Sequence, residues 1–142
     1  MKEGWEDWVK YLPDKIIKHG ILIELSGPLR SMWPIAYAEI IAHCLADNAY
    51  AMLGGALYIV EDDHITLSGD RWRCDQNKCD RNKAELWANY CVRSAAEMLV
   101  YMSKISSSSV NQDVWFTVVA TNQPDKNNLL AQILDSVGNE LL

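Results

Sequence analysis

The chain has 142 residues, with 13 lysines and arginines against 19 aspartates and glutamates, and a formal net charge of −6. That length predicts one domain over residues 1–142, large enough to bury a core without disulfides or metal. A hydrophobic fraction of 49% and a charged fraction of 23% exclude disordered, collagen-like and coiled-coil proteins. The acidic balance argues against nucleic acid or an anionic membrane as a partner, because both favour basic surfaces. It favours a basic partner or none.

The sequence has no stretch long and apolar enough to span a bilayer. Residues 1–12 are acidic and rich in tryptophan, unlike a signal peptide with its charged and then apolar segments. These features predict a cytoplasmic protein, in which cysteines are expected as thiols. The four cysteines are Cys44, Cys74, Cys79 and Cys91.

The first elements expected are two short helices and a strand. Apolar residues recur at helical spacing over residues 5–12, and Pro13 interrupts the run. A second helix over residues 14–19 is expected to end at Gly20 in a left-handed conformation. Residues 21–25 are apolar and bounded by turn-forming residues, which predicts a short buried strand.

The next segment predicts a helix followed by strands. The helix is expected over residues 31–47, with Pro34 in its first turn, where a missing N–H is harmless. Residues 50–53 and 56–60 are strand-like and are separated or kinked by Gly54–Gly55. The two glycines indicate either a tight turn or a bulge where another backbone comes close.

The middle of the chain predicts a hairpin, a loop and the longest helix. Residues 65–67 are strand-like and follow an acidic turn, so residues 56–67 are expected to form a hairpin. Residues 68–82 are expected to form one long polar loop. Asp80 is placed to cap a helix whose apolar positions keep a helical period over residues 84–105.

The C-terminal part predicts a break, a strand and a helix. Residues 106–109 are all serine and indicate a flexible break, whereas residues 114–120 are rich in β-branched and aromatic residues. Residues 129–137 predict a final helix. Strands gathered in the middle with helices around them predict an α+β fold, a single compact domain with a small mixed or antiparallel sheet packed by helices.

Half of the net charge falls in residues 61–80, which hold six acidic and three basic residues. This block is either a solvated surface or an acidic recognition surface with an aromatic anchor for a basic partner. Trp72 has a second interpretation, as a core residue that holds the loop. The residues predicted to bind a partner are Glu61, Asp62, Asp63, Asp70, Trp72 and Asp75.

The sequence motifs predict no catalytic residue, metal or cofactor. The chain lacks the G-x-S-x-G motif of a serine nucleophile, and Gly54–Gly55 lacks the basic and glycine-rich context of a phosphate loop. His19 lies at an expected helix C-terminus and His43 on the polar flank of a helix, which are ordinary places for histidine.

One alternative function is a small thiol- or zinc-dependent enzyme that uses Cys74, Cys79 and His64. These residues lie near one another in the sequence. A tetrahedral zinc site would need a second pair of ligands, which the sequence does not supply at the usual spacing. The two thiols are also within reach of a disulfide by spacing alone, and both interpretations stay open at this point.

Six segments in a fixed order carry a resemblance to a known family. They are Gly4–Trp5, Ser31–Met32–Trp33–Pro34, residues 49–58 (AYAMLGGALY), residues 69–75 (GDRWRCD), Tyr90 with Ser94–Ala95–Ala96, and Trp115–Phe116–Thr117–Val118–Val119. Together they resemble immunity protein family forty of bacterial toxin systems. The family pattern tends to place Asp where this chain has Ala56, and Asn where it has Arg71.

The resemblance implies a protein that binds and blocks the toxin domain encoded beside it, and that is not an enzyme. Many such pairs belong to contact-dependent growth inhibition systems, whose toxins are often small basic nucleases such as tRNases. An acidic inhibitor suits a basic nuclease, because its carboxylates can occupy positions meant for phosphates. The implied partner is therefore a cognate toxin domain, with no direct nucleic acid and no membrane.

Overall fold

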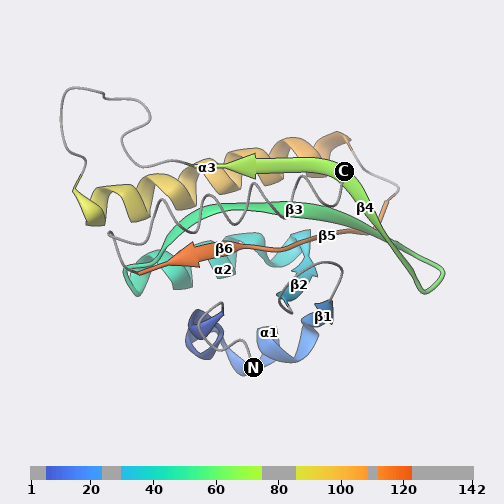
Figure 1. Ribbon diagram of the computed structural model, residues 1–142, viewed down its shortest axis with the longest axis horizontal. Coiled ribbons are helices and arrows are strands. Elements are labelled where there is room, and N and C mark those ends of the chain that lie inside the picture. The colour runs from blue at the N-terminus through green and yellow to red at the C-terminus, as the bar shows by residue number, and fades with distance from the viewer. Residues whose placement is uncertain (1–5, 24–29, 75–85, 109–111, 123–142) are drawn as a thin grey trace.

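The computed structural model describes residues 6–23, 30–74, 86–108 and 112–122. Six strands form one sheet with the order β1-β2-β5-β3-β4, and β6 also pairs with β3. Every pairing is antiparallel, and α3 runs alongside β3 and β4 (Figure 1). The elements are η1 Asp7–Tyr11, α1 Asp14–His19, β1 Ile21–Ile23, β2 Arg30–Pro34, η2 Ile35–Tyr37, α2 Ala38–Asp47, β3 Ala51–Glu61, β4 His64–Arg73, α3 Trp87–Ser108, β5 Val114–Phe116 and β6 Val119–Thr121.

The predicted α+β class is confirmed, with an antiparallel sheet and helices packed on it. α2 and α3 contact each other, and both contact β3, which holds the centre of the sheet. The main core lies between these helices and the sheet. A smaller cluster of Ile23, Met32, Ala56 and Tyr58 is buried apart from it. In the part of the chain that the structure describes, no helix has the length and apolar character needed to cross a membrane.

The N-terminal elements form where they were expected, with two differences. Gly20 is extended (φ −76°, ψ 152°), so its predicted left-handed conformation is wrong. The position still favours glycine, because a Cβ atom there would lie 2.8 Å from the indole nitrogen of Trp33. In β1, Ile21 and Leu22 are exposed and only Ile23 is buried, because β1 is an edge strand of the described sheet.

The helix predicted over residues 31–47 begins later than expected. Its first residues form β2, which pairs with β1 and β5, and α2 begins at Ala38. A residue before proline disfavours helical backbone, so Trp33 before Pro34 favours the extended strand in which it pairs with β5. From Ala38 the predicted pattern holds, and Ala38, Ile41 and Leu45 lie buried on one face.

Gly54–Gly55 lies inside one continuous strand, β3, rather than between two strands. An ideal Cβ atom on Gly55 would lie 2.0 Å from the carbonyl oxygen of Thr117, so a side chain there has no room. The Thr117 backbone N–H donates to the Ala56 carbonyl oxygen, and the Thr117 hydroxyl accepts from the Ala56 N–H. The interpretation as a close backbone approach is confirmed. This contact also divides the predicted strand 114–120 into β5 and β6.

The predicted hairpin is confirmed, but the predicted polar loop is wrong for residues 68–73. Those residues continue β4, because Trp72 pairs with Gly55 and packs into the main core. Gly69 has φ +92° and lies where the β3–β4 register shifts. The strand therefore bulges at Gly69 and still reaches the core with Trp72.

α3 confirms the longest predicted helix and extends to Ser108, so the break predicted over residues 106–109 is wrong for residues 106–108. The buried Ser94 hydroxyl accepts from the Met52 N–H at 2.9 Å and donates to the Cys91 carbonyl oxygen at 2.8 Å. It thereby satisfies a backbone donor at the second irregularity of β3. The predictions for Trp5, the Asp80 cap and the helix over 129–137 lie outside the described residues.

Candidate functional site

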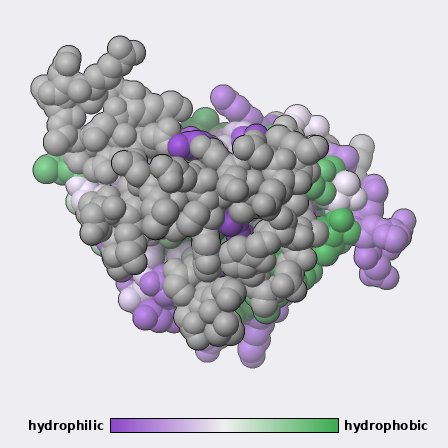
Figure 2. All heavy atoms as spheres, in the orientation of Figure 1, coloured by the Kyte–Doolittle hydropathy of each residue, from purple (hydrophilic) through white to green (hydrophobic). Residues whose placement is uncertain are grey.

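The turn between β3 and β4 presents the predicted acidic residues to solvent. Glu61 ends β3 and faces His64, the first residue of β4, while Asp62 and Asp63 form the turn between them. All four residues are exposed. The hairpin extends past the rest of the described elements, and hydrophilic atoms project from the surface there (Figures 1 and 2).

The backbone of this turn suits aspartate. Asp62 and Asp63 have φ values of 48° and 68°, and two successive positive φ angles are the pattern of a type I′ hairpin turn. Aspartate tolerates this region better than most residues, because its short polar side chain can bond locally. The same two residues therefore close the hairpin and place two carboxylates at its end.

A fourth carboxylate joins the turn from a distant part of the sequence. β5 pairs with β3, and the Asp113 carbonyl oxygen accepts from the Val60 N–H at 2.9 Å. The exposed Asp113 side chain accepts a hydrogen bond from the Trp115 indole at 3.0 Å. Sequence reasoning missed Asp113, because only the strand pairing brings it to the turn. Glu61, Asp62, Asp63 and Asp113 are called the acidic tip below.

Among the other predicted contact residues, Trp72 is the one whose side chain the structure describes, and it is not part of the acidic tip. Trp72 is 6% exposed and belongs to the main core, as its second interpretation proposed. It lies nine residues along the chain from Asp63, roughly 25 Å at the usual rise of a strand. Asp70 lies within β4, but its side chain is outside what the structure describes, and so is the whole of Asp75. Partner binding by these six residues stays a prediction.

Of the predicted thiol or zinc site, the structure describes His64 and Cys74, and these two residues do not come together. His64 begins β4 and Cys74 follows its end, which separates them by on the order of 30 Å. Cys79 lies outside the described residues. Cys74 is buried, its Sγ accepts from Arg93 at 3.4 Å, and its carbonyl oxygen accepts from the Tyr90 hydroxyl. Over the described ranges, no group of three His, Cys, Asp or Glu residues is placed to hold a metal.

The surroundings of Cys44, Cys91, His19 and His43 are those of ordinary structural residues. Burial raises the pKa of the Cys91 thiol to about 11, and it also raises the pKa of Cys44. Both thiols are therefore poor nucleophiles at neutral pH. His19 bonds the Lys15 carbonyl oxygen within its own helix, and His43 lies 3.9 Å from Glu39 one turn away.

The described residues thus define a small α+β protein with an exposed, acidic hairpin turn. A family model described as Immunity protein 40 matches residues 24–120, more than half of the chain. The chain belongs to the Immunity protein 40 family and is an immunity protein of a bacterial toxin system. Membership supports a toxin-neutralising role and the binding of a cognate toxin. No curated protein and no solved structure matches the chain.

Proposed function

We propose that this protein protects the cell that makes it by binding a basic cognate toxin domain through the acidic tip. The toxin is a nuclease such as a tRNase of a contact-dependent growth inhibition system, and the complex forms in the cytoplasm. The protein is an inhibitor and not an enzyme, and it contacts neither nucleic acid nor membrane.

The acidic tip is the observation that carries this proposal. Glu61, Asp62 and Asp63 are consecutive and exposed, and Asp113 adds a fourth carboxylate from β5. Clustered carboxylates speed encounter with a basic surface and fix its orientation. On a nuclease, they would occupy the positions of the phosphates of the nucleic acid.

Apolar surface beside the acidic tip supports a protein partner rather than a counter-ion. Ile65 follows His64 on β4 and is 40% exposed. An apolar side chain next to carboxylates gives a protein contact something to bury, whereas rim charges alone contribute mostly to the association rate. Asp70 and Asp75 stay candidate contact residues, and we give Trp72 the role of holding β4 in position.

The test is protection of cells that express the toxin domain encoded by the neighbouring gene. The variant Glu61→Gln with Asp62→Asn and Asp63→Asn removes three charges and keeps side chains that accept positive φ. The matched control is Glu39→Gln with Asp14→Asn and Asp47→Asn, which removes three exposed carboxylates elsewhere.

We expect wild type and control to restore growth and the tip variant to lose most of the protection. Protection by the tip variant equal to that of the control would reject the surface assignment. Failure of wild type itself to protect would reject the proposed function.

A further inference from the structure

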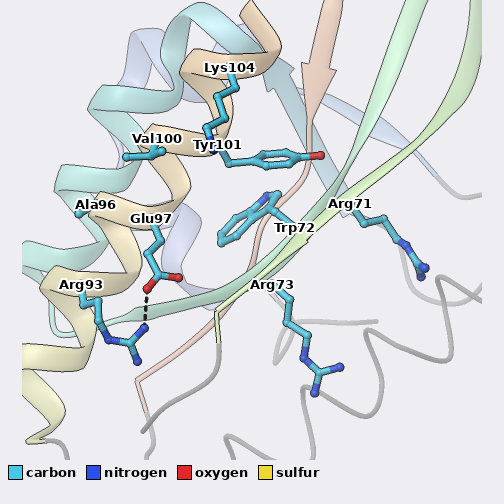
Figure 3. Close-up of a pocket in the computed structure, with 9 residues that line it drawn as sticks. All are labelled: Arg71, Trp72, Arg73, Arg93, Ala96, Glu97, Val100, Tyr101 and Lys104. Atoms are coloured by element: carbon cyan, nitrogen blue, oxygen red, sulfur yellow. Dashed lines mark hydrogen bonds and ion pairs between the residues drawn. The ribbon is translucent and has the colours of Figure 1, made fainter. Parts of the chain in front are cut away.

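A second charged surface lies between α3 and β4, well away from the acidic tip. It is an open groove of about 490 Å³. Figure 3 shows Trp72 pointing from β4 toward α3, while Arg71 and Arg73 extend away from the helix. The residues that line this α3–β4 groove are Arg71, Trp72, Arg73, Arg93, Ala96, Glu97, Val100, Tyr101 and Lys104.

The charge of this groove is opposite to that of the protein. Four lining residues are cationic and only Glu97 is anionic, in a chain of net charge −6. Arg93 and Glu97 form an ion pair of 2.7 Å along α3. Arg71 and Lys104 are exposed and form no ion pair with the residues that the structure describes. Because both side chains are exposed, an anionic ligand can reach them.

The groove also has an apolar side. Ala96 and Val100 line it, and Val92 continues the same exposed stripe one turn earlier on α3, outside the groove. The two valines are 65% and 56% exposed. This stripe is about 12 Å long at the helical rise. Trp72 forms part of the wall, and its indole nitrogen is buried without a hydrogen-bond partner. An exposed apolar stripe beside cations is typical of a protein interface rather than of an inert surface.

We propose that the α3–β4 groove binds an acidic, partly apolar segment of the toxin. This inference rests on the proposed function, because it takes the same protein as the partner. A small anion would use Arg71 and Lys104 but would leave the stripe from Val92 to Val100 uncovered. A protein segment with carboxylates and apolar side chains covers both the groove and the stripe beside it.

Two surfaces of opposite charge on one β-hairpin would fix the orientation of the toxin. The acidic tip and Arg71 lie near opposite ends of β4. In the reversed orientation, each charged surface of the toxin would meet like charge, which disfavours that orientation. The groove thereby adds specificity that the acidic tip alone does not provide.

The experiment measures the dissociation constant for the toxin domain encoded by the neighbouring gene. The groove variant is Arg71→Glu with Lys104→Glu, and its control is Lys15→Glu with Lys18→Glu on α1. All four side chains are exposed, and both variants change the net charge by the same amount. A third variant, Val92→Ser with Val100→Ser, tests the apolar stripe without changing charge. Thermal unfolding verifies that each variant is folded.

We expect the groove variant to bind roughly tenfold or more weakly than the control, and the valine variant to bind a few-fold more weakly than wild type. Equal affinity of the groove variant and its control would overturn this inference while leaving the proposed function intact. Tighter binding by the groove variant would also overturn it. Absence of binding by wild type would overturn both.

Discussion

The acidic tip and the α3–β4 groove lie near opposite ends of β4, and the chain builds these two surfaces in different ways. The acidic tip is built mostly by consecutive residues of a tight turn. The groove is built by β4 and by α3, which are separated in the sequence by more than a dozen residues. A surface built locally can be recognised from the sequence. A surface built by two distant elements emerges only when they pack together.

The comparison also shows why the net charge of a segment is a weak guide. Residues 61–80 look like one acidic block, yet Arg71 and Arg73 are among them. Because the residues after the turn form an extended strand, the acidic tip and these arginines lie roughly 25 Å apart. Exposed charges at that distance are largely screened from each other in physiological salt. Residues 61–80 therefore contribute to two separate charged surfaces.

The largest effect on stability is expected at Trp72, which anchors the groove end of β4. Trp72→Ala should lower the free energy of unfolding by about 3–5 kcal/mol, because it leaves a cavity in the main core. Trp72→Phe should cost less, about 1–2 kcal/mol, since it also removes a buried N–H without a partner. Urea denaturation measures both. If Trp72→Ala changed toxin affinity but left stability unchanged, Trp72 would be a contact residue and not an anchor.

The next effect is expected at Gly55, which sets the spacing between β3 and the Thr117 backbone. Gly55→Ala should lower the free energy of unfolding by about 2–4 kcal/mol, because the new methyl group would overlap backbone. Gly69→Ala is the matched control. A Cβ atom on Gly69 would meet nothing within 4 Å. The substitution should therefore lower the free energy of unfolding by only about 1 kcal/mol, because alanine is disfavoured at the positive φ of this position. Equal costs at the two glycines would contradict the close approach.

A smaller effect on stability is expected at the acidic tip, where two pairs of substitutions separate the role of the charges from that of the backbone angles. Replacing Asp62 and Asp63 by asparagine should change stability by less than about 0.5 kcal/mol, because asparagine accepts the same turn. Replacing both by lysine should cost about 1–2 kcal/mol, because lysine is disfavoured at positive φ. Thermal unfolding compares the two variants. A lysine variant as stable as the asparagine variant would show that the turn does not require these angles.

The smallest effect is expected at the thiols. Since burial raises the pKa of Cys91 to about 11, its thiolate fraction stays low at pH 8 and increases only as the pH approaches that value. Iodoacetamide should label the partly exposed Cys44 before Cys91 in the folded protein, and mass spectrometry of peptides identifies the sites. Cys74→Ser should still protect cells from the toxin. Loss of protection with a retained fold would revive a thiol mechanism.

The sequence predicted those parts of the fold that depend on neighbouring residues. The hairpin follows from two aspartates between strand-forming segments, and α2 follows from its spacing of apolar residues after Ala38. The start of α2 was misplaced because tertiary pairing recruited Trp33 and Pro34 into β2. The Gly54–Gly55 pair indicated a close backbone approach, but not that Thr117 would supply it.

The same limit applies to the candidate site, of which only the part built by consecutive residues could be predicted. Glu61, Asp62 and Asp63 could be identified because a turn exposes consecutive residues. Asp113 could not, because it reaches the acidic tip only through the pairing of β3 with β5. The groove was missed for a related reason. Its cations alternate with the core residue Trp72 along β4, and Lys104 is contributed by a different element.

The most direct test of the central claim is the salt dependence of toxin binding. The dissociation constants of wild type and of the variant Glu61→Gln with Asp62→Asn and Asp63→Asn are measured for the toxin domain between low and physiological salt. We predict at least roughly tenfold weaker binding by the variant at low salt, and a smaller loss of affinity as salt increases, because fewer charges remain to be screened. Equal affinities with the same salt dependence would contradict binding of a basic toxin by the acidic tip.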